Sequence, residues 1–434
     1  MRLTSWGKYP IIESTFLSSA TSAGFTQYIA TNKFLPCIAR GAGRSYGDSA
    51  LAETVLSSRF LNHLVDFDAQ TGTLRCEAGV TLAEMLGIFV PRGWFIASTP
   101  GTKLITVGGA VASDVHGKSH HIEGCFSQQV LALTLLLGNG EIISVSRESH
   151  PDLFRATCGG MGLTGMILDV TFKLRPINST YLRETTFKAA NLEESLTLIE
   201  ESESTTYSVA WIDCVSTGSL LGRSLLMVGE FTDDGRLDLP KGKPLSVPVD
   251  MPGFLLNQYS VAAFNALYYH RVRQPRTERV VHFEPFFYPL DGVHHWNRIY
   301  GKDGFTQYQF VLPKESGWVG MAEILKRIAE SKRGSFLAVL KAFGKANDNY
   351  LSFPMEGYTL ALDFKIDAGL FGFLDELDRI VLDHGGRLYL SKDVRMSEAT
   401  FKRGYPLWET FSEIRHRYGA TKVFRSLQSD RLGL

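Results

Sequence analysis

Three glycine-rich segments in the first part of the chain constrain its fold more than any other feature. They are ARGAGRSYGDSA at 39–50, STPGTKLITVGGAVASDVHGKSHH at 98–121 and CGGMGLTG at 158–165. Glycine has no Cβ, so main-chain N–H groups in such loops can approach a pyrophosphate closely. The three segments therefore predict a nucleotide cofactor.

The third segment also fits the dinucleotide fingerprint of a Rossmann domain, with Gly160, Gly162 and Gly165 at the required spacing. That fingerprint needs a helix directly after the glycines. The residues that follow, MILDVTFKL, are rich in β-branched side chains and predict a strand, and no clear βαβ unit precedes them. The sequence therefore disfavours a Rossmann site.

Strands and helices alternate between the glycine segments. We expect a strand at 71–80, and then a helix at 81–93 that starts with a capping box of Thr81 and Glu84. Asn139-Gly140 predicts a tight hairpin between strands at 131–137 and 141–145. A further strand at 166–176 ends at Pro176.

Composition changes after Pro176, where glycine becomes sparse. We expect an acidic helical segment at 183–204, and helices at 317–331, 367–384 and 406–418. Apolar strands are predicted at 206–213, 223–231, 305–312, 336–343 and 358–364. The chain is therefore predicted to be an α+β protein of two domains. They are a cofactor domain of residues 1–179, completed by 387–434, and a domain of residues 180–386 built on an antiparallel sheet.

Taken together, the glycine segments resemble the vanillyl-alcohol-oxidase type of FAD-binding domain, in which two such loops surround the pyrophosphate. The resemblance implies FAD as cofactor. It assigns FAD contacts to Arg40, Gly41, Ala42, Gly43, Arg44, Ser45, Tyr46, Gly47, Asp48, Gly101, Thr106, Val107, Gly108, Gly109, Ser113, Asp114, Val115, His116, Ile167 and Tyr389. Some members attach the flavin covalently through a histidine of the first loop. Arg44 occupies that position here, so we expect non-covalent FAD.

A closer resemblance covers nearly the whole chain. GRSYGDSA, ITVGGAVASDVHGKSHH, LFRATCGGMGLTG, FYPLDGVHHWNRIYGKDGFTQYQFVLP, SFLAVLKAFG and GGRLYLSKDVR occur in order from 43 to 395. This pattern is similar to the decaprenylphosphoryl-β-D-ribose 2′-oxidase family. The resemblance implies oxidation of the C2′ hydroxyl of a polyprenyl-phosphoryl ribose to a ketone, the first half of an epimerisation to the arabinose form. It also implies an NAD(P)-dependent reductase partner of the short-chain type.

Two other functions stay open from the sequence. One is an FAD oxidase of a soluble alditol or aldonolactone, and the other is a flavoprotein component that chiefly docks a reductase. One departure from the family pattern also has a consequence. The family's inhibitor-reactive cysteine falls on Ala361 in the strand YTLALDF, so covalent nitroaromatic inhibitors are expected not to capture this protein.

The resemblance places the catalytic candidates around the flavin. Lys392 in LYLSKD is the first of them, as the group that orients the hydroxyl or stabilises charge on the reduced flavin. His116 follows the second loop and has a side chain suited to proton handling. Tyr46 in RSYGD is a candidate donor to substrate or flavin.

The substrate-binding candidates lie in the second domain. Gln307 and Gln309 alternate along one strand, so both face the same side, which we expect to be the substrate cleft. Lys341 is the candidate for the phosphate of the substrate, and Lys392 is expected to contact the sugar as well. His120 and His121 lie close to His116, but the spacing lacks a carboxylate or cysteine that would complete a metal site.

Residues 250–279 combine apolar, aromatic and basic side chains. We expect a helical element that touches a lipid surface, and the alternative is a buried helix followed by a solvated loop. The side chains proposed for lipid contact are Phe254, Leu255, Leu256, Tyr259, Phe264, Leu267, Tyr268 and Tyr269, together with Arg271, Arg273, Arg276 and Arg279.

Overall charge argues against a nucleic-acid-binding protein. Lysine and arginine number 45, aspartate and glutamate also number 45, and the formal net charge is therefore zero. The five cysteines are scattered and odd in number, so we expect no disulfide framework. The first residues, MRLTSWGKYP, contain no apolar signal core, which predicts a cytoplasmic protein with peripheral membrane contact at most.

Overall fold

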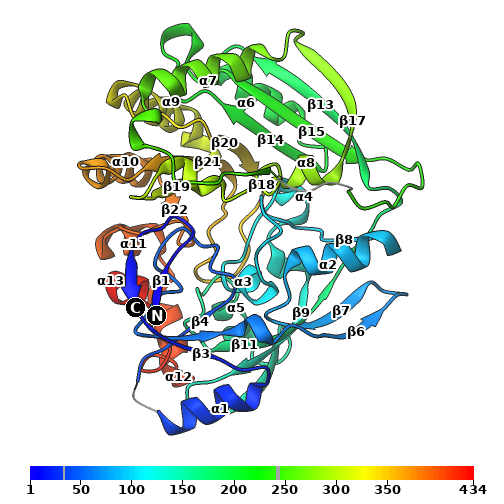
Figure 1. Cartoon of the computed structure of the whole chain (residues 1–434), viewed down its shortest axis with the longest axis vertical. Helices are drawn as coiled ribbons and strands as arrows, with labels where there is room; N and C mark the ends of the chain where they lie inside the picture. Colours follow the sequence, from blue (N-terminus) through cyan, green and yellow to red (C-terminus); the bar gives the residue numbers. More distant parts are fainter. Residues whose placement is uncertain (33–34, 241–244) are drawn as a thin grey trace.

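The computed structural model describes residues 1–32, 35–240 and 245–434. It has two halves (Figure 1), and residues of both line a central cavity. The lower half in Figure 1 contains the first third of the chain and the C-terminal helices, and the upper half contains a large sheet. All five cysteines are buried and free.

Two sheets form the centre of the lower half. One is a parallel sheet of β3 (Thr15–Ser18), β5 (Thr54–Ser57) and β4 (Ile38–Arg40). The other is antiparallel and has the order β10 (Ile142–Ser146), β9 (Val130–Leu136), β11 (Met166–Lys173), β7 (Thr73–Glu77) and β6 (Leu64–Asp68). Short pairs join β1 (Arg2–Thr4) to β2 (Ile11–Glu13) and β8 (Trp94–Phe95) to β12 (Arg175–Pro176).

The first part of the chain contributes only short helices to this half. They are α1 (Ser22–Thr31), α2 (Leu82–Phe89), α3 (Val107–Ala112), α4 (His120–Glu123) and α5 (Pro151–Thr157). The predicted capping box is confirmed, since Thr81 and Glu84 exchange hydrogen bonds at the start of α2. The hairpin at Asn139-Gly140 is also confirmed, because β9 pairs with β10 and Gly140 adopts φ +88°.

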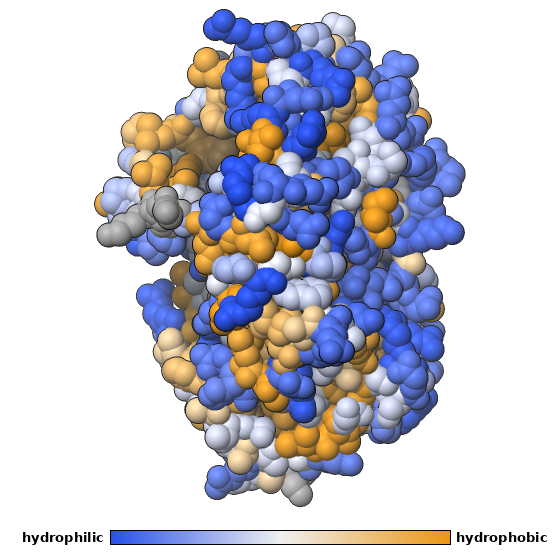
Figure 2. All heavy atoms as spheres, turned by 90° about the vertical axis from the view of Figure 1, so that its right-hand side faces the viewer, coloured by the Kyte–Doolittle hydropathy of each residue, from blue (hydrophilic) through white to orange (hydrophobic). Residues whose placement is uncertain are grey.

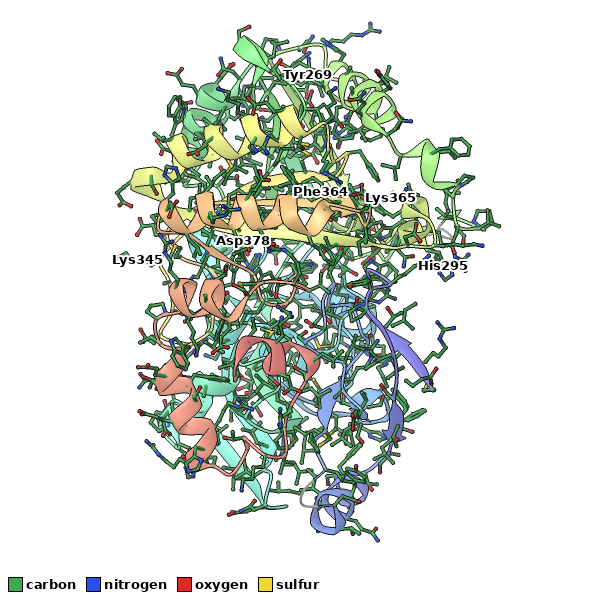
Figure 3. The ribbon with its side chains drawn as sticks, turned by 90° about the vertical axis from the view of Figure 1, so that its left-hand side faces the viewer. Tyr269, His295, Lys345, Phe364, Lys365 and Asp378 are labelled. Carbon is green, nitrogen blue, oxygen red and sulfur yellow. The ribbon has the colours of Figure 1, made fainter. Side chains whose placement is uncertain are left out.

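An eight-stranded antiparallel sheet forms the upper half. Its order is β17 (Arg276–His282), β13 (Tyr181–Ala189), β15 (Ser224–Phe231), β14 (Tyr207–Ile212), β20 (Ala338–Phe343), β21 (Gly357–Lys365), β19 (Phe305–Pro313) and β22 (Arg387–Leu388). The five strands predicted in this region are all present. Helices α6 (Leu192–Glu201), α9 (Lys314–Ser331) and α10 (Leu370–Asp383) pack on the sheet. Figure 3 shows α9 and α10 side by side over it.

The segment 183–204 corrects one prediction. Residues 181–189 form β13, which pairs with β15 and β17 on its two sides, and only Leu192–Glu201 is helical. Partners from distant parts of the chain supply the hydrogen bonds of β13, so its local sequence did not reveal the strand.

The C-terminal residues return to the lower half through α11 (Glu398–Gly404), α12 (Trp408–Arg417) and α13 (Leu427–Leu432). Buried Arg415 donates to the carbonyl of Leu163, and Cys37 forms a β-bridge with Phe424. This arrangement supports a division in which 387–434 complete the first domain, and we keep that division as a proposal.

Apart from strand β17, the segment between β15 and β19 lies outside the eight-stranded sheet. It contains the small parallel pair of β16 (Leu245–Ser246) and β18 (Val293–His294), and the helices α7 (Gln258–His270) and α8 (Phe283–Phe287). On the face shown in Figure 2, hydrophobic side chains gather on a projecting part of the upper half, and the surface beside it is hollowed. Among the described residues, no helix is both long and apolar enough to cross a membrane.

Candidate functional site

A cavity of about 860 Å³ lies between the two halves. The three glycine segments line its lower wall, the inner face of the eight-stranded sheet lines its upper wall, and the C-terminal segment 389–392 closes one end. A single cavity therefore brings together residues from the start, the middle and the end of the chain.

The first glycine loop presents unpaired backbone donors to this cavity. Within the described part of the chain, the amide N–H groups of Ala42, Gly43, Arg44 and Ser45 have no hydrogen-bond acceptor. Gly43 adopts φ +63°, which favours glycine. A Cβ on Gly41 would lie 2.1 Å from Oγ1 of Thr106, so the two loops could not approach so closely with any other residue there.

The second loop is held open toward the cavity. Thr106 caps α3 by accepting a hydrogen bond from Gly109 N at 3.2 Å. A Cβ on Gly108 would lie 2.8 Å from Cβ of Ala78, whereas one on Gly101 would meet no heavy atom within 4 Å. Unpaired amides on one loop and free space beside the other fit the pyrophosphate of a bound dinucleotide. The site therefore fits FAD.

Most of the residues predicted to contact FAD line this cavity. They are Arg40, Gly41, Ala42, Gly43, Arg44, Ser45, Tyr46, Gly101, Thr106, Gly108, Gly109, Ser113, Val115, His116, Ile167 and Tyr389. The predicted substrate-binding residues Gln307, Gln309, Lys341 and Lys392 line it too.

Four residues predicted to contact FAD, namely Gly47, Asp48, Val107 and Asp114, are not among the residues that line the cavity, and their contact with FAD stays a prediction. Asp48 pairs with Arg431 at 2.7 Å, and Val107 is fully buried in the core. A Cβ on Gly47 would lie 1.6 Å from the carbonyl oxygen of Asp393, so this glycine permits a close crossing of two segments.

Asp114 joins the two halves of the molecule. Its buried carboxylate accepts hydrogen bonds from Asn347 at 2.8 Å, Asn349 at 2.9 Å and Ser352 at 2.6 Å, and from the amide of Ser127 at 3.1 Å. The loop after β20 is thereby fixed against the residues that follow α3. Because sequence spacing shows only that Asp114 follows the second loop, it did not reveal where the side chain points.

Lys392 lies against the aromatic ring of Tyr46. Its ammonium nitrogen is 3.9 Å from the ring centroid, and the amide of Tyr46 donates to the carbonyl of Ser391 at 3.0 Å. Burial lowers the pKa of Lys392 to about 7, nearby Asp363 opposes that shift, and Lys341 adds to it. The side chain is therefore poised to exchange a proton near neutral pH.

His116 is held as a neutral ring. Its Nε2 lies 3.0 Å from Nε2 of Gln309, so the amide donates to an unprotonated ring nitrogen. Burial lowers the pKa of His116 well below its usual value, and the charges of Lys341 and Lys392 contribute. Its buried Nδ1 has no hydrogen-bond partner among the described residues.

Asp363 is a site residue that the sequence did not single out. It stands opposite Gln307 in the register of β19 and β21, and Gln307 donates to its Oδ1 at 2.6 Å. The hydroxyl of Tyr300 lies 3.4 Å from its Oδ2. Burial raises the pKa of Asp363 to about 7, and the charge of Lys392 opposes that shift. Asp363 can be identified as a site residue only from the pairing of β19 with β21.

Lys118 is a second cavity residue that the sequence analysis did not predict. It lines the cavity, donates to the carbonyl of Phe286 and lies 4.4 Å above that residue's ring. Burial lowers the pKa of Lys118 to about 7 and that of Lys341 to about 8. Three half-buried lysines thus share a cavity, and Lys341 has no carboxylate within ion-pair distance among the described residues. Such a cavity favours an anionic ligand.

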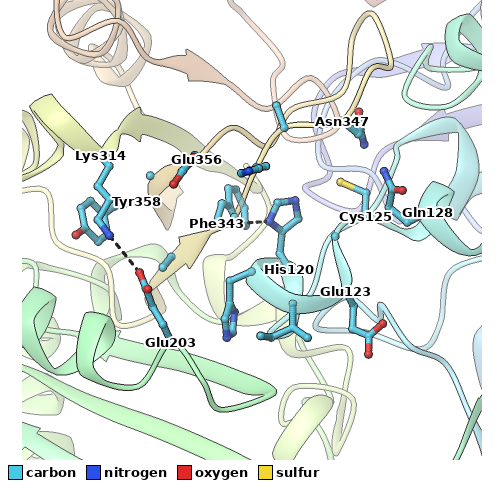
Figure 4. A pocket seen from close by; sticks show the side chains of 18 residues that line it. His120, Glu123, Cys125, Gln128, Glu203, Lys314, Phe343, Asn347, Glu356 and Tyr358 are labelled. Atoms are coloured by element: carbon cyan, nitrogen blue, oxygen red, sulfur yellow. Dashed lines mark hydrogen bonds and ion pairs between the residues drawn. The ribbon is translucent and has the colours of Figure 1, made fainter.

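A separate cavity of about 560 Å³ lies behind His120 (Figure 4). Among its lining residues, Lys314 pairs with Glu203 at 3.1 Å, and Glu123 pairs with Arg175, which lies outside the lining. The ring of Phe343 separates it from the first cavity, with centroids 4.7 Å from His116 and 4.5 Å from His120. His120 accepts from Gly344 N, and His121 donates to Thr205 O, so the two histidines serve different partners.

The sequence matches known proteins in agreement with this geometry. A family model described as an FAD binding domain matches residues 27–146. The decaprenylphosphoryl-β-D-ribose oxidase of Mycolicibacterium smegmatis is 35% identical, over 100% of this chain and 97% of that protein. The L-gulono-1,4-lactone dehydrogenase of Mycobacterium tuberculosis is 20% identical over 88% of this chain and 87% of that protein. The bovine L-gulonolactone oxidase is 31% identical over 34% of this chain and 33% of that protein.

The 35% identity extends along nearly the whole of both chains. The match to the FAD-binding model and the glycine loops around the cavity agree with it. The chain is an FAD-dependent oxidoreductase and belongs to the decaprenylphosphoryl-β-D-ribose oxidase family.

Proposed function

We propose that this protein oxidises the C2′ hydroxyl of a polyprenyl-phosphoryl-β-D-ribose to the corresponding ketone. The observation that carries the proposal is the convergence of Lys118, Lys341 and Lys392 on the cavity that the FAD-binding loops line. A phosphodiester would supply an anionic partner for Lys341, which has no carboxylate partner among the described residues, and a secondary hydroxyl would supply a proton for Lys392, whose pKa is near neutral.

When bound, FAD supplies the acceptor for the hydride that leaves the sugar carbon. Lys392 Nζ accepts the proton of the hydroxyl, because its lowered pKa leaves a large fraction of the amine neutral near pH 7. The ring of Tyr46 holds that nitrogen from one side, and Asp363 stabilises the ammonium once the proton has been transferred. These three groups come from the first loop, β21 and the C-terminal segment.

The substrate is oriented by the polar side chains of the sheet. Asp363 fixes the amide of Gln307, and His116 fixes that of Gln309, so each glutamine presents its remaining polar atom in a defined direction. Lys341 extends from the neighbouring strand β20, and we assign it to the phosphate. The keto sugar would then need reduction, for which we propose the NAD(P)-dependent partner that the resemblance implies.

Anaerobic mixing tests this function. Polyprenyl-phosphoryl-β-D-ribose should bleach the oxidised flavin absorbance, and mass spectrometry should find a product two hydrogens lighter. Bleaching by free alditols or aldonolactones alone would favour the soluble-substrate oxidase. Absence of bleaching by either class would leave the role of a flavoprotein component that docks a reductase.

We also propose that the protein docks on a membrane surface through α7 and the residues before it. Moving a prenyl chain into water costs about 0.8 kcal/mol per CH₂, so the enzyme must reach the sugar at the bilayer. Phe254 and Leu267 are each 75% exposed and Tyr259 is 77% exposed, which is unusual for such side chains. Figure 3 shows the light-green α7 segment projecting from the body on the side where His295 lies.

The four arginines predicted to contact lipid make different contacts in the structure. Arg279 pairs with buried Glu184 at 2.7 Å, and Arg276 pairs with Glu278 on strand β17. Arg271 packs 3.7 Å above the ring of Tyr268, and Arg273 is exposed without an ion pair in the described residues. Leu256 and Tyr268 are half-buried and Tyr269 is buried. The docking proposal therefore uses Arg271 and Arg273 with the five exposed apolar side chains, Phe254, Leu255, Tyr259, Phe264 and Leu267.

A further inference from the structure

We infer that the first isoprene units of the substrate lie in an apolar groove whose wall is formed by one side of α7 and the adjoining inner face of the eight-stranded sheet. This groove, called the α7 groove below, consists of Trp211, Met227, Phe264, Tyr268, Phe336 and Val339, all of which line the cavity. The inference rests on the proposed function, and it adds that the enzyme recognises the prenyl chain itself as well as the sugar phosphate.

The aromatic side chains of the α7 groove form a continuous surface. The ring centroid of Tyr268 lies 4.6 Å from that of Trp211 and 5.7 Å from that of Phe264, which in turn lies 5.6 Å from Phe336. The indole N–H of Trp211 donates to the carbonyl of Phe336 at 3.1 Å. Its polar atom is therefore satisfied, and an apolar ligand in the groove would leave no donor of Trp211 unpaired.

The strand register connects this surface to the proposed phosphate site. Lys341 and Val339 are two residues apart on β20, so they face the same side of the sheet. Val339 pairs with Trp211 on β14, and the next strand, β15, contributes Met227. Adjacent strands are about 4.8 Å apart. The cavity wall therefore changes from the cationic Lys341 to the apolar Trp211 and Met227 within one or two strands. A ligand whose phosphate is followed by an alkyl chain needs its contacts in that order.

The other end of the α7 groove opens at the surface. Phe264 lines the cavity and is still 41% exposed, so it stands at the mouth of the groove. Leu267, on the same helix, is 75% exposed and does not line the cavity. Helix α7 thus borders the groove with one side and presents apolar side chains to the surroundings with another, which gives a prenyl chain a covered route from the proposed membrane surface to Lys341.

A chain-length series on the intact FAD-loaded enzyme tests the inference. The substrates are methyl-, geranyl- and farnesyl-phosphoryl-β-D-ribose in detergent micelles, and kcat/KM comes from anaerobic flavin reduction. We expect the farnesyl ester to exceed the methyl ester by about tenfold or more, because even one methylene in an apolar pocket is worth about tenfold. Calorimetric Kd values of methyl and farnesyl phosphate should differ in the same direction without any turnover.

Three variants locate the effect. F264D should reduce the farnesyl-to-methyl ratio by about tenfold, mainly through KM, with F264A as a milder second variant if the aspartate perturbs folding. V319D introduces the same charge at an exposed position of α9 and serves as the general control.

The possible outcomes distinguish failure of the α7 groove inference from failure of the proposed ribose oxidation. Equal kcat/KM values for the methyl and farnesyl esters in the wild type, or an unchanged ratio in both folded Phe264 variants, would overturn the α7 groove while leaving ribose oxidation intact. Failure of every ribose ester to reduce the flavin would instead defeat the proposed function on which the inference rests.

Discussion

The ammonium nitrogen of Lys392 lies 3.9 Å from the ring centroid of Tyr46, although the two residues are 346 positions apart. The backbone reinforces this contact, since Tyr46 N donates to Ser391 O. The electron-rich face of the ring favours a charged lysine, while burial favours a neutral one. These two effects oppose each other, and the pKa of Lys392 is about 7, which suits proton transfer at neutral pH.

Replacement of Lys392 by alanine should leave FAD bound and abolish most substrate oxidation. Loss of a proton acceptor typically costs about 10²–10⁴-fold, which stopped-flow measurement of anaerobic flavin reduction will detect. Lys345, an exposed lysine at the second cavity, supplies the matched control K345A. Reduction of K392A at a rate close to that of the wild type would refute the assignment.

The rate of flavin reduction should rise with pH through a midpoint near 7. Lys392 must be neutral to accept the hydroxyl proton, and burial has lowered its pKa to about 7, so acid removes the active form. Asp363 raises the pKa of Lys392, and therefore D363N should move the midpoint to lower pH. A midpoint that is the same in both proteins would show that another group takes the proton.

Covalent nitroaromatic inhibitors of the family should not modify the wild-type protein, because Ala361 stands where the family has its reactive cysteine. Ala361 lines the cavity opposite Gln309 in the strand register, so A361C places a thiol beside the substrate site. After incubation of the enzyme with inhibitor and substrate, intact-mass spectrometry should show an adduct on A361C. An adduct on the wild type would disprove the prediction.

Acid precipitation should release all of the FAD into the supernatant. Arg44 occupies the position of the attaching histidine, and its guanidinium lies 4.1 Å above the ring of Trp6. A guanidinium does not form the flavin linkage that the imidazole of other members forms. Yellow colour that stays with the washed pellet would contradict non-covalent binding.

Binding to anionic liposomes should depend on the exposed side of α7. A triple change of Phe254, Tyr259 and Leu267 to serine should remove most of the sedimentation with vesicles, since these side chains are among the most exposed apolar groups described. R271S/R273S should weaken binding at low salt, by roughly 1 kcal/mol for each arginine near the lipid. R276S is the control, because Arg276 is already paired with Glu278. Equal sedimentation of all variants would exclude this docking surface.

Local sequence determined the parts of this protein that depend on local conformation. Gly43 and Gly140 mark backbone turns that favour glycine, and Thr81 with Glu84 marks a helix start, so their roles follow from spacing alone. The alternation of Gln307 and Gln309 likewise placed both side chains on one face of β19.

Tertiary structure decided the electrostatics of the site. Asp363 reaches Gln307 and influences Lys392 only because β21 pairs with β19 in one particular register. Asp114 turns away from the cofactor loops because Asn347 and Ser352 supply its hydrogen bonds from the other half of the molecule. Burial and pairing between distant segments set the pKa values and the direction of these side chains, and neither quantity is a property of a short stretch of sequence.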